Sequence, residues 1–299
     1  MLSGFAIILE NDILYCSNDS KLTTFEVVIF VQILIDSINR KRSWRLNNIF
    51  FSEQSDNMES MILKHIILNS SENLFYCVIG DSTLESSVAV HALEEFSKNI
   101  DDLFQNKLIT RLDTPTEQAL FRERIETVIF NLKQKYNYEA LNEYIDHHIG
   151  IGPSNKILYA GISSQGLPII SKLYDNELLY DSGKEYNSEN MEIFCSDLSA
   201  KLATITMNTI IRANTHIREI QIRDIEDLGY DKIILYANIN NYSVDFVAAG
   251  NFKEIKEIFR FFLGSISQEN IFNKVFTGDL KPYKHLQKYL DELVQYFDN

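Results

Sequence analysis

The sequence predicts an α/β (α+β) protein made of two similar halves, because one arrangement of apolar runs and longer helical stretches occurs twice. Residues 74–80 form an apolar run that leads into a long helical stretch, and residues 244–250 do the same. The doubling extends upstream, where the short run at 5–9 corresponds to the run at 157–162. Each half is predicted to contain two strands, a helix, three strands and then helices.

Length and composition favour two domains and exclude some classes of function. A chain of 299 residues that is 45% hydrophobic is long enough to bury two separate cores. The formal net charge of −14 and the isoelectric point near 4.9 argue against a nucleic-acid partner, because phosphates repel an acidic surface. Cys16, Cys77 and Cys195 lie far apart, which indicates buried thiols in a reducing, cytoplasmic setting. The densest apolar run, residues 27–35, is much shorter than the roughly 20 residues that span a bilayer.

The first half begins with a predicted hairpin. Residues 5–9 and 13–16 flank the polar turn at 10–12. Residues 24–39 follow, and they are apolar on every side, which predicts a helix covered on more than one face. Three further strands are predicted at residues 46–51, 60–68 and 74–80.

Two helices should close the first half, each opened by a capping box. Ser82 and Glu85 have the spacing that satisfies free amides at a helix start, and that helix is predicted to reach about Lys107. Residues 114–117 repeat the pattern with a proline at the first helical position, and this helix is predicted to continue to about residue 147.

The second half repeats this order with an insertion. Gly80 corresponds to Gly250 (250 − 80 = 170), whereas Ile13 corresponds to Leu167 (167 − 13 = 154). About sixteen extra residues therefore separate the copies (170 − 154 = 16), and the polar stretch at 174–190 is the predicted loop that holds them. The remaining predicted elements are a helix at 191–213, strands at 217–225, 232–239 and 244–249, a helix capped by Asn251 and Glu254, and a last helix at 282–297. The Gly/Pro/Ser cluster at 150–155 marks the predicted boundary, which gives domains at 1–150 and 151–299.

This order of elements resembles the longin fold and, more loosely, the related roadblock domain. The resemblance rests on residues 4–10 with 13–17, on the apolar helix after them, and on residues 75–81 entering the next helix. It covers nearly the whole chain, but it is a pattern of elements and not a residue signature. The resemblance implies two tandem α-β-α sandwiches, each a five-stranded antiparallel sheet with one helix on one face and two on the other. It also implies a function carried by surfaces, with no catalytic residues and no cofactor.

Longin-type domains occur in SNAREs, trafficking adaptors, tethering complexes and paired activators of small GTPases. A longin SNARE would continue into a heptad coiled coil and a membrane anchor, whereas here a second globular half follows. The resemblance therefore implies a non-catalytic scaffold that binds or regulates small GTPases or trafficking machinery, as a subunit of a nucleotide-exchange or tethering assembly. The implied partners are a small GTPase or another longin or roadblock-type subunit, in a homo- or hetero-oligomer, with peripheral contact with a membrane. The alternative is a small-molecule sensing module with a profilin-like or PAS-like sandwich, for which a polar-lined cavity would be evidence.

No motif in the sequence predicts catalysis, a metal site or a cofactor. The glycines at 150 and 152 are followed by Pro153 and are not preceded by an apolar strand, so the dinucleotide fingerprint fails. His147 and His148 are adjacent, so on a helix their side chains point about 100° apart, and a polar helix end is favoured over a metal site. Cys77 lies in an apolar strand, which favours a buried core thiol over a nucleophile.

Two groups are the candidate partner-binding residues. The first is the dense cation cluster with the single tryptophan: Arg40, Lys41, Arg42, Trp44 and Arg45. It suits an anionic lipid or an acidic partner, or alternatively the negative end of the preceding helix. The second group is Phe30, Val31 and Leu34 on the outer face of the apolar helix. These face the other half or another protein, unless the helix at 114–147 folds over them.

The two copies also differ in their first helix. In the second copy this helix carries several hydroxyl side chains, at Ser196, Ser199, Thr204, Thr206 and Thr209. The sequence therefore predicts one half built for burial and another half whose helix tolerates solvent.

Overall fold

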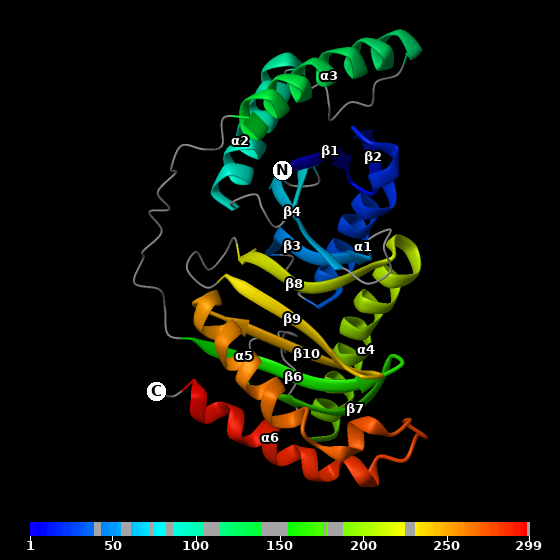
Figure 1. Ribbon diagram of the computed structural model, residues 1–299. Helices are drawn as coiled ribbons and strands as arrows, with labels where there is room; N and C mark the ends of the chain where they lie inside the picture. The colour runs from blue at the N-terminus through cyan, green and yellow to red at the C-terminus, as the bar shows by residue number, and fades with distance from the viewer. Residues whose placement is uncertain are drawn as a thin grey trace. The chain divides into compact units, whose positions relative to one another are not determined.

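The computed structural model describes residues 1–38, 43–54, 61–71, 74–81, 86–104, 114–138, 155–175, 178, 188–224 and 231–297. It is a mixed α/β structure whose strands form antiparallel ladders (Figure 1). The predicted order of strands and helices is confirmed in both halves. The first half contains β1 (Leu2–Leu9), β2 (Asp12–Cys16), α1 (Leu22–Ile38), β3 (Trp44–Gln54), β4 (Met61–Ser71), β5 (Leu74–Asp81), α2 (Ser86–Phe104) and α3 (Pro115–Tyr138). The second half contains β6 (Lys156–Ser164), β7 (Leu167–Leu173), α4 (Ser188–Ala213), β8 (Thr215–Asp224), β9 (Lys232–Ile239), β10 (Tyr242–Ala249), α5 (Phe252–Ile266) and α6 (Gln287–Glu292).

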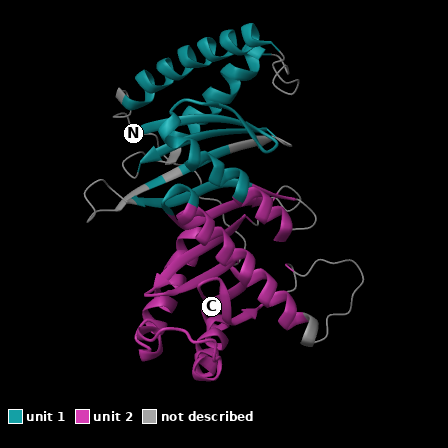
Figure 2. Cartoon of the chain, turned by 90° about the vertical axis from the view of Figure 1, so that its right-hand side faces the viewer, with its two compact units in different colours: residues 1–30, 46–149, 212–215 teal, residues 31–45, 150–211, 216–299 magenta. Residues whose placement is uncertain are grey.

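Contacts divide the chain into two compact units, coloured in Figure 2. Unit 1 comprises Met1–Phe30, Leu46–Ile149 and Arg212–Thr215. Unit 2 comprises Val31–Arg45, Gly150–Ile211 and His216–Asn299. The main change of unit falls between residues 149 and 150, and α1 is divided between the units after Phe30.

The strands of the two units follow the same order in space. In unit 1 neighbouring strands run β2-β1-β5-β4-β3, and in unit 2 they run β8-β9-β10-β6-β7. When the strands of each unit are numbered in chain order, both arrangements become 2-1-5-4-3. The repeat seen in the sequence is therefore also a repeat of strand topology.

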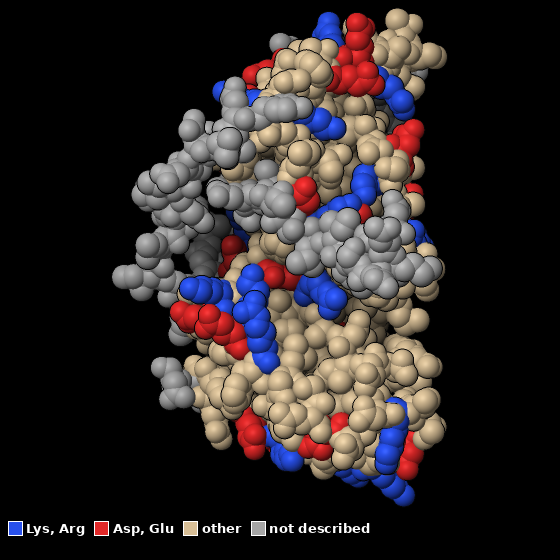
Figure 3. Space-filling model, viewed as in Figure 1, with Lys and Arg blue, Asp and Glu red and all other residues tan. Residues whose placement is uncertain are grey.

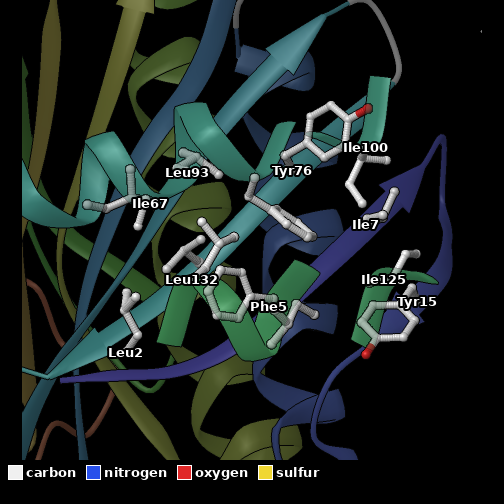
Figure 4. Packing of buried hydrophobic residues seen from close by; sticks show 14 of the residues in the cluster. Leu2, Phe5, Ile7, Tyr15, Ile67, Tyr76, Leu93, Ile100, Ile125 and Leu132 are labelled. Atoms are coloured by element: carbon white, nitrogen blue, oxygen red, sulfur yellow. The ribbon is translucent and has the colours of Figure 1, made fainter. Parts of the chain in front are cut away.

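Helices α2 and α3 cover one face of the unit 1 strands. Figure 4 shows apolar side chains from β1, β4 and β5 meeting those of the two helices. Phe96 of α2 lies edge-on to Phe5 of β1 and Tyr76 of β5, with ring centroids 5.0 and 5.9 Å apart. This edge-on geometry is favourable for aromatic rings, and it holds α2 in position on the sheet.

In unit 2, α5 and the C-terminal segments cover the corresponding face. Their core includes Phe246 of β10 and Phe259 of α5, whose ring centroids are 5.3 Å apart. The hydroxyls of Tyr242 and Tyr283 lie 2.7 Å apart, and the Tyr242 hydroxyl donates to the carbonyl of Lys274 at 2.6 Å. These polar contacts tie the chain after α5 to β10.

Two of the predicted helix caps are confirmed. At α3 the Glu117 amide donates to the Thr114 hydroxyl (3.2 Å), while the Thr114 amide donates to the Glu117 carboxylate (3.1 Å). At α5 the side chain of Asn251 accepts from the Lys253 amide at 3.0 Å and donates to Glu254 at 3.0 Å. The capping box predicted at 82–85 lies outside the described residues.

Other predicted elements differ from the structure. The helix predicted at 282–297 is wrong as a single element, because α6 is short and is flanked by 3-10 turns at Lys281–Leu286 and Leu293–Tyr296. The residues that this segment buries are Tyr283, Leu286, Leu290 and Leu293. The helix predicted to reach residue 147 is described only as far as Tyr138, and most of the boundary cluster at 150–155 and of the loop at 174–190 lies outside the described residues. Across the part of the chain that is described, no helix is both long and apolar enough to cross a membrane.

Candidate functional site

The apolar residues proposed to bind a partner on α1 have different environments. Val31 is fully buried, whereas Phe30 and Leu34 are half-buried. In unit 1 the guanidinium of Arg212 lies 5.8 Å from the ring centroid of Phe30, within the range of a cation–π contact. Ile33 was not singled out from the sequence, yet it is 49% exposed and is the accessible apolar residue at this point of the helix.

The alternative cover for these residues is wrong. The helix expected to fold over them is α3, and its described part packs instead with α2 and β1 in the core of unit 1. Phe121, Ile125 and Leu132 are its buried residues there. The described part of α3 therefore buries one of its faces on α2 and β1.

The tryptophan of the predicted basic cluster is buried within unit 2. Trp44 is 4% exposed, and its indole N–H donates to the Asp224 carboxylate at 3.2 Å. The same carboxylate oxygen accepts from the ammonium of Lys232 at 3.1 Å, and the Lys232 side chain is fully buried. Breaking a buried ion pair leaves an uncompensated charge and costs about 3–5 kcal/mol. Trp44 is thus a structural donor to a buried ion pair.

The rest of the basic cluster gives less information. Arg45 is half-buried and donates to the carbonyl of Trp44 at 3.3 Å. Arg40, Lys41 and Arg42 lie outside the described residues. Figure 3 shows basic and acidic side chains interspersed on the face that it draws. The binding role predicted for this cluster therefore stays a prediction.

A cluster of charged groups lies at one end of the unit 1 sheet. Lys64 and Lys21 both donate to the Glu53 carboxylate, the latter at 3.0 Å, and all three side chains are less than a fifth exposed. Burial alone would raise the pKa of Glu53, but the hydrogen bonds from the two lysines outweigh it and lower that pKa. The cluster joins the start of α1 to β3 and β4, which is a structural role.

Unit 2 contains a buried polar cluster that the sequence analysis did not identify. It lies on the face of the unit 2 strands opposite the α5 core, the face that α4 covers (Figure 1). Its centre is Asp245 of β10, which is fully buried and pairs with Gly161 on one side and Tyr236 on the other. We call the group formed by Asp245, Tyr159, Tyr236 and Ser199 the Asp245 cluster.

Hydrogen bonding within the Asp245 cluster is incomplete. Both carboxylate oxygens of Asp245 and the hydroxyl of Tyr236 are buried without a hydrogen-bond partner among the described residues, whereas the Tyr159 hydroxyl interacts with the hydroxyls of Ser199 and Ser171. An unpaired buried polar group costs roughly 1–3 kcal/mol. Several such groups between α4 and the unit 2 strands lower the stability of this interface.

A glycine makes room for this arrangement. A Cβ atom placed on Gly161 would lie 2.2 Å from the Tyr159 hydroxyl and 2.8 Å from the ring carbon that bears it. No side chain fits there, so the Tyr159 hydroxyl lies over the backbone of Gly161, next to the strand that carries Asp245. The glycine is needed for its small size, and this explains its position in the interior of a strand.

Burial shifts the ionisation of the cluster strongly. It raises the pKa of Asp245 from an ordinary value of 3.8 to about 8. Burial, and then the nearby Asp245, raise the pKa of Tyr159 and of Tyr236. Asp245 is therefore a neutral carboxylic acid near neutral pH, since an isolated buried carboxylate is unfavourable.

The hydroxyl side chains of α4 correct one sequence interpretation. Ser199, Thr206 and Thr209 are buried, and only Ser196 and Thr204 are exposed. The first three therefore do not reflect tolerance of solvent but face the interior of unit 2. One signal was available in the sequence, namely an aspartate between Val244 and Phe246 in an otherwise apolar strand.

Other candidate chemistry in the sequence does not form a site. Cys77 is fully buried, and burial raises the pKa of its thiol. The histidine pair at 147–148 and the glycines at 150 and 152 lie outside the described residues. Where residues are described, no group of three or more His, Cys, Asp or Glu side chains is placed to hold a metal ion.

Comparison with known proteins adds no assignment. No protein-family model matches this chain, and no curated protein sequence matches it significantly.

Proposed function

We propose that this protein is a non-catalytic interaction scaffold of two longin-like units, which binds or regulates small GTPases or membrane-trafficking machinery. The observation that carries the proposal is the strand order 2-1-5-4-3, found once in each unit with the same order of helices. In longin domains one helix covers one face of the sheet and two helices cover the other face. Here α2 and α3 share one core in unit 1, and α5 and the C-terminal segments share another in unit 2, which supports the proposal.

The surface of α1 is the proposed place of contact. Phe30 and Leu34 keep part of their surface accessible, and Ile33 lies between them with half of its surface exposed. An exposed aliphatic residue flanked by half-buried apolar ones is a suitable centre for a helix-mediated interface. The proposed partner is a small GTPase or another subunit of the longin or roadblock type.

Regulation of a GTPase by such a scaffold needs no acid or base. Nucleotide exchange follows when a partner holds the switch segments in a conformation that binds nucleotide weakly. This fits a protein whose buried polar residues serve packing, as the Trp44, Asp224 and Lys232 contacts do.

Binding to purified GTPases tests the proposal. The full chain is immobilised and offered small GTPases of the same organism in nucleotide-free, GDP-bound and GTP-bound forms, with light scattering to give the oligomeric state. We expect capture that depends on the nucleotide state and that weakens at least tenfold in Ile33→Glu. Phe130→Ser is the matched control, because Phe130 is an apolar residue that is 62% exposed on a different helix, α3. A monomer that captures no GTPase in any state contradicts the proposal.

A small-molecule sensing module is the second candidate, and the Asp245 cluster is the observation that favours it. Unpaired buried polar groups between a sheet and a helix are the kind of lining that orients a polar ligand. Native mass spectrometry of the purified chain tests this. A bound metabolite that is lost in Asp245→Leu would favour this candidate over the scaffold, and a bare chain mass would remove its support.

A further inference from the structure

The Asp245 cluster has the properties of a closed state and not of a permanent core. The Asp245 side chain is enclosed completely, yet neither oxygen has a partner in the described part of the chain. A carboxyl group in such a place is tolerated only while it carries its proton, because burial disfavours the ionised form and no cationic side chain in the described part of the chain offsets it.

We propose that unit 2 has a second, open state in which α4 separates from the strands and water reaches Asp245, and that loss of the Asp245 proton drives this opening. The inference does not depend on the proposed function, since it concerns the interior of one unit.

Helix α4 is the element that moves, because the strands beneath it are held on both sides. Strand β10 is hydrogen-bonded to β9 and to β6, and β6 is also hydrogen-bonded to β7. The side of α4 that faces the strands carries Thr206, whose hydroxyl has no partner among the described residues, and Ser199, whose hydroxyl interacts with that of Tyr159. Opening therefore breaks only the Ser199–Tyr159 interaction of these two hydroxyls and allows water to reach both of them.

The titratable groups around Asp245 do not stabilise its ionised form. The titratable groups that face the cluster are the phenols of Tyr159 and Tyr236 on the flanking strands and the thiol of Cys195 on α4, which acts on Tyr159. Where residues are described, no lysine, arginine or histidine contributes to the pKa of Asp245, and its rise to about 8 is caused by burial.

The direction of the pH effect follows from proton linkage. The closed state keeps the proton up to about pH 8, whereas the open state releases it near the ordinary value of 3.8. Between these values the open state binds one proton fewer, so the ratio of open to closed molecules rises about tenfold for each pH unit. Below this window the closed state is favoured most, and above it the effect levels off.

The chain carries natural probes for this opening. Cys195 lies on α4 and is 8% exposed, whereas Cys77 lies in β5 of unit 1 and is fully buried. The experiment measures the labelling rate of each thiol with limiting methyl methanethiosulfonate from pH 5 to pH 8, resolved by peptide mass spectrometry. It compares the natural chain with Asp245→Asn, a neutral side chain of the same shape. The ratio of the two rates cancels the pH dependence of the thiol chemistry itself.

We expect the rate ratio at Cys195 to rise towards tenfold per pH unit, with the ratio at Cys77 constant. A flat ratio at Cys195 would overturn the proposal, and so would an equal rise at Cys77, which would mean global unfolding. If Asp245→Asn does not fold, hydrogen exchange of the natural chain decides the matter. Protection of α4 amides, corrected for intrinsic rates, should then fall with pH relative to β10, and parallel behaviour of α4 and β10 would reject the opening.

Discussion

The two units share a strand topology but differ in the sheet face that lies opposite their main cores. In unit 1 this face carries Ile8 beside Phe75, both apolar and buried. In unit 2 the corresponding pair is Gly161 beside Asp245, and Phe75 and Asp245 differ by the same spacing that relates Gly80 to Gly250 (245 − 75 = 170). One unit therefore fills this layer with an aromatic ring, and the other fills it with an acid.

The difference shows that topology and stability are set by separate residues. Alternation along each strand keeps the cores formed with α2 and α5 apolar, and both units have the order 2-1-5-4-3. The opposite layer can then vary from Phe75 to Asp245 without changing that order. What varies is the cost of closing the layer, and it makes unit 2 sensitive to pH.

The largest effect is expected when the acid is transferred to unit 1. Phe75→Asp removes a buried ring and encloses a carboxyl group, so it should lower the free energy of unfolding by more than about 5 kcal/mol near neutral pH. Phe130→Asp is the control, because that ring is 62% exposed and its loss should change stability by roughly 0.5 kcal/mol or less. Denaturant titration followed by circular dichroism gives both values. A tolerated Phe75→Asp would mean that this layer of unit 1 is not packed as described.

The second effect concerns pH. The folded-state pKa of Asp245 is raised, so the folded chain holds the proton longer than the unfolded one, and stability falls as pH rises from about 4 towards 8. This group alone should cost on the order of 4 kcal/mol between pH 4 and pH 7. The natural chain and Asp245→Asn should be similar in stability at pH 4 and diverge above it. Parallel pH profiles for the two proteins would show that Asp245 titrates normally.

A smaller effect is expected at the glycine that makes room for Tyr159. Gly161→Ala places a methyl group 2.2 Å from the Tyr159 hydroxyl and should destabilise unit 2 by about 1–3 kcal/mol through overpacking. Gly264→Ala on α5 is the control with the opposite sign. Nothing lies within 4 Å of its added methyl group, so it should stabilise the helix by about 0.5–1 kcal/mol. Equal shifts in midpoint for the two variants would contradict the close contact at Gly161.

The smallest effect is expected at a feature that the two units share, a helix with a side-chain cap at its start. Thr114→Ala removes the cap of α3 in unit 1, and Asn251→Ala removes the cap of α5 in unit 2. Each variant loses the side-chain hydrogen bonds of its cap and should lower stability by about 1 kcal/mol. Thermal melts of the two variants should therefore shift alike. A much larger loss in one of them would mean that its helix has an additional role in folding.

Local patterns predicted most of the elements and two of the helix caps. Capping boxes and the turn between β1 and β2 depend on residues only a few positions apart, so Thr114 with Glu117 and Asn251 with Glu254 were identified correctly. The mixture of 3-10 and α turns after Pro282 was missed, because that geometry follows from what the segment packs against.

The candidate site was predicted less well, for a physical reason. Hydroxyl side chains are nearly neutral in helices, so Ser199 and Thr206 of α4 do not reveal from sequence which side they occupy. Trp44 was placed in a candidate binding surface, whereas it is buried and donates to Asp224, a residue 180 positions away in the chain. The Asp245 cluster likewise requires three strands and a helix to be brought together.

Direct titration of Asp245 is the measurement that tests this account most closely. The chain is labelled with ¹³C at aspartate carboxyl carbons, and the Asp245 resonance is assigned by its absence in Asp245→Asn. The account predicts a titration midpoint of about 8, with the carboxyl group protonated at neutral pH. A midpoint near the ordinary value of 3.8 would contradict it, because Asp245 would then be hydrated or paired and the polar layer of unit 2 would not be closed.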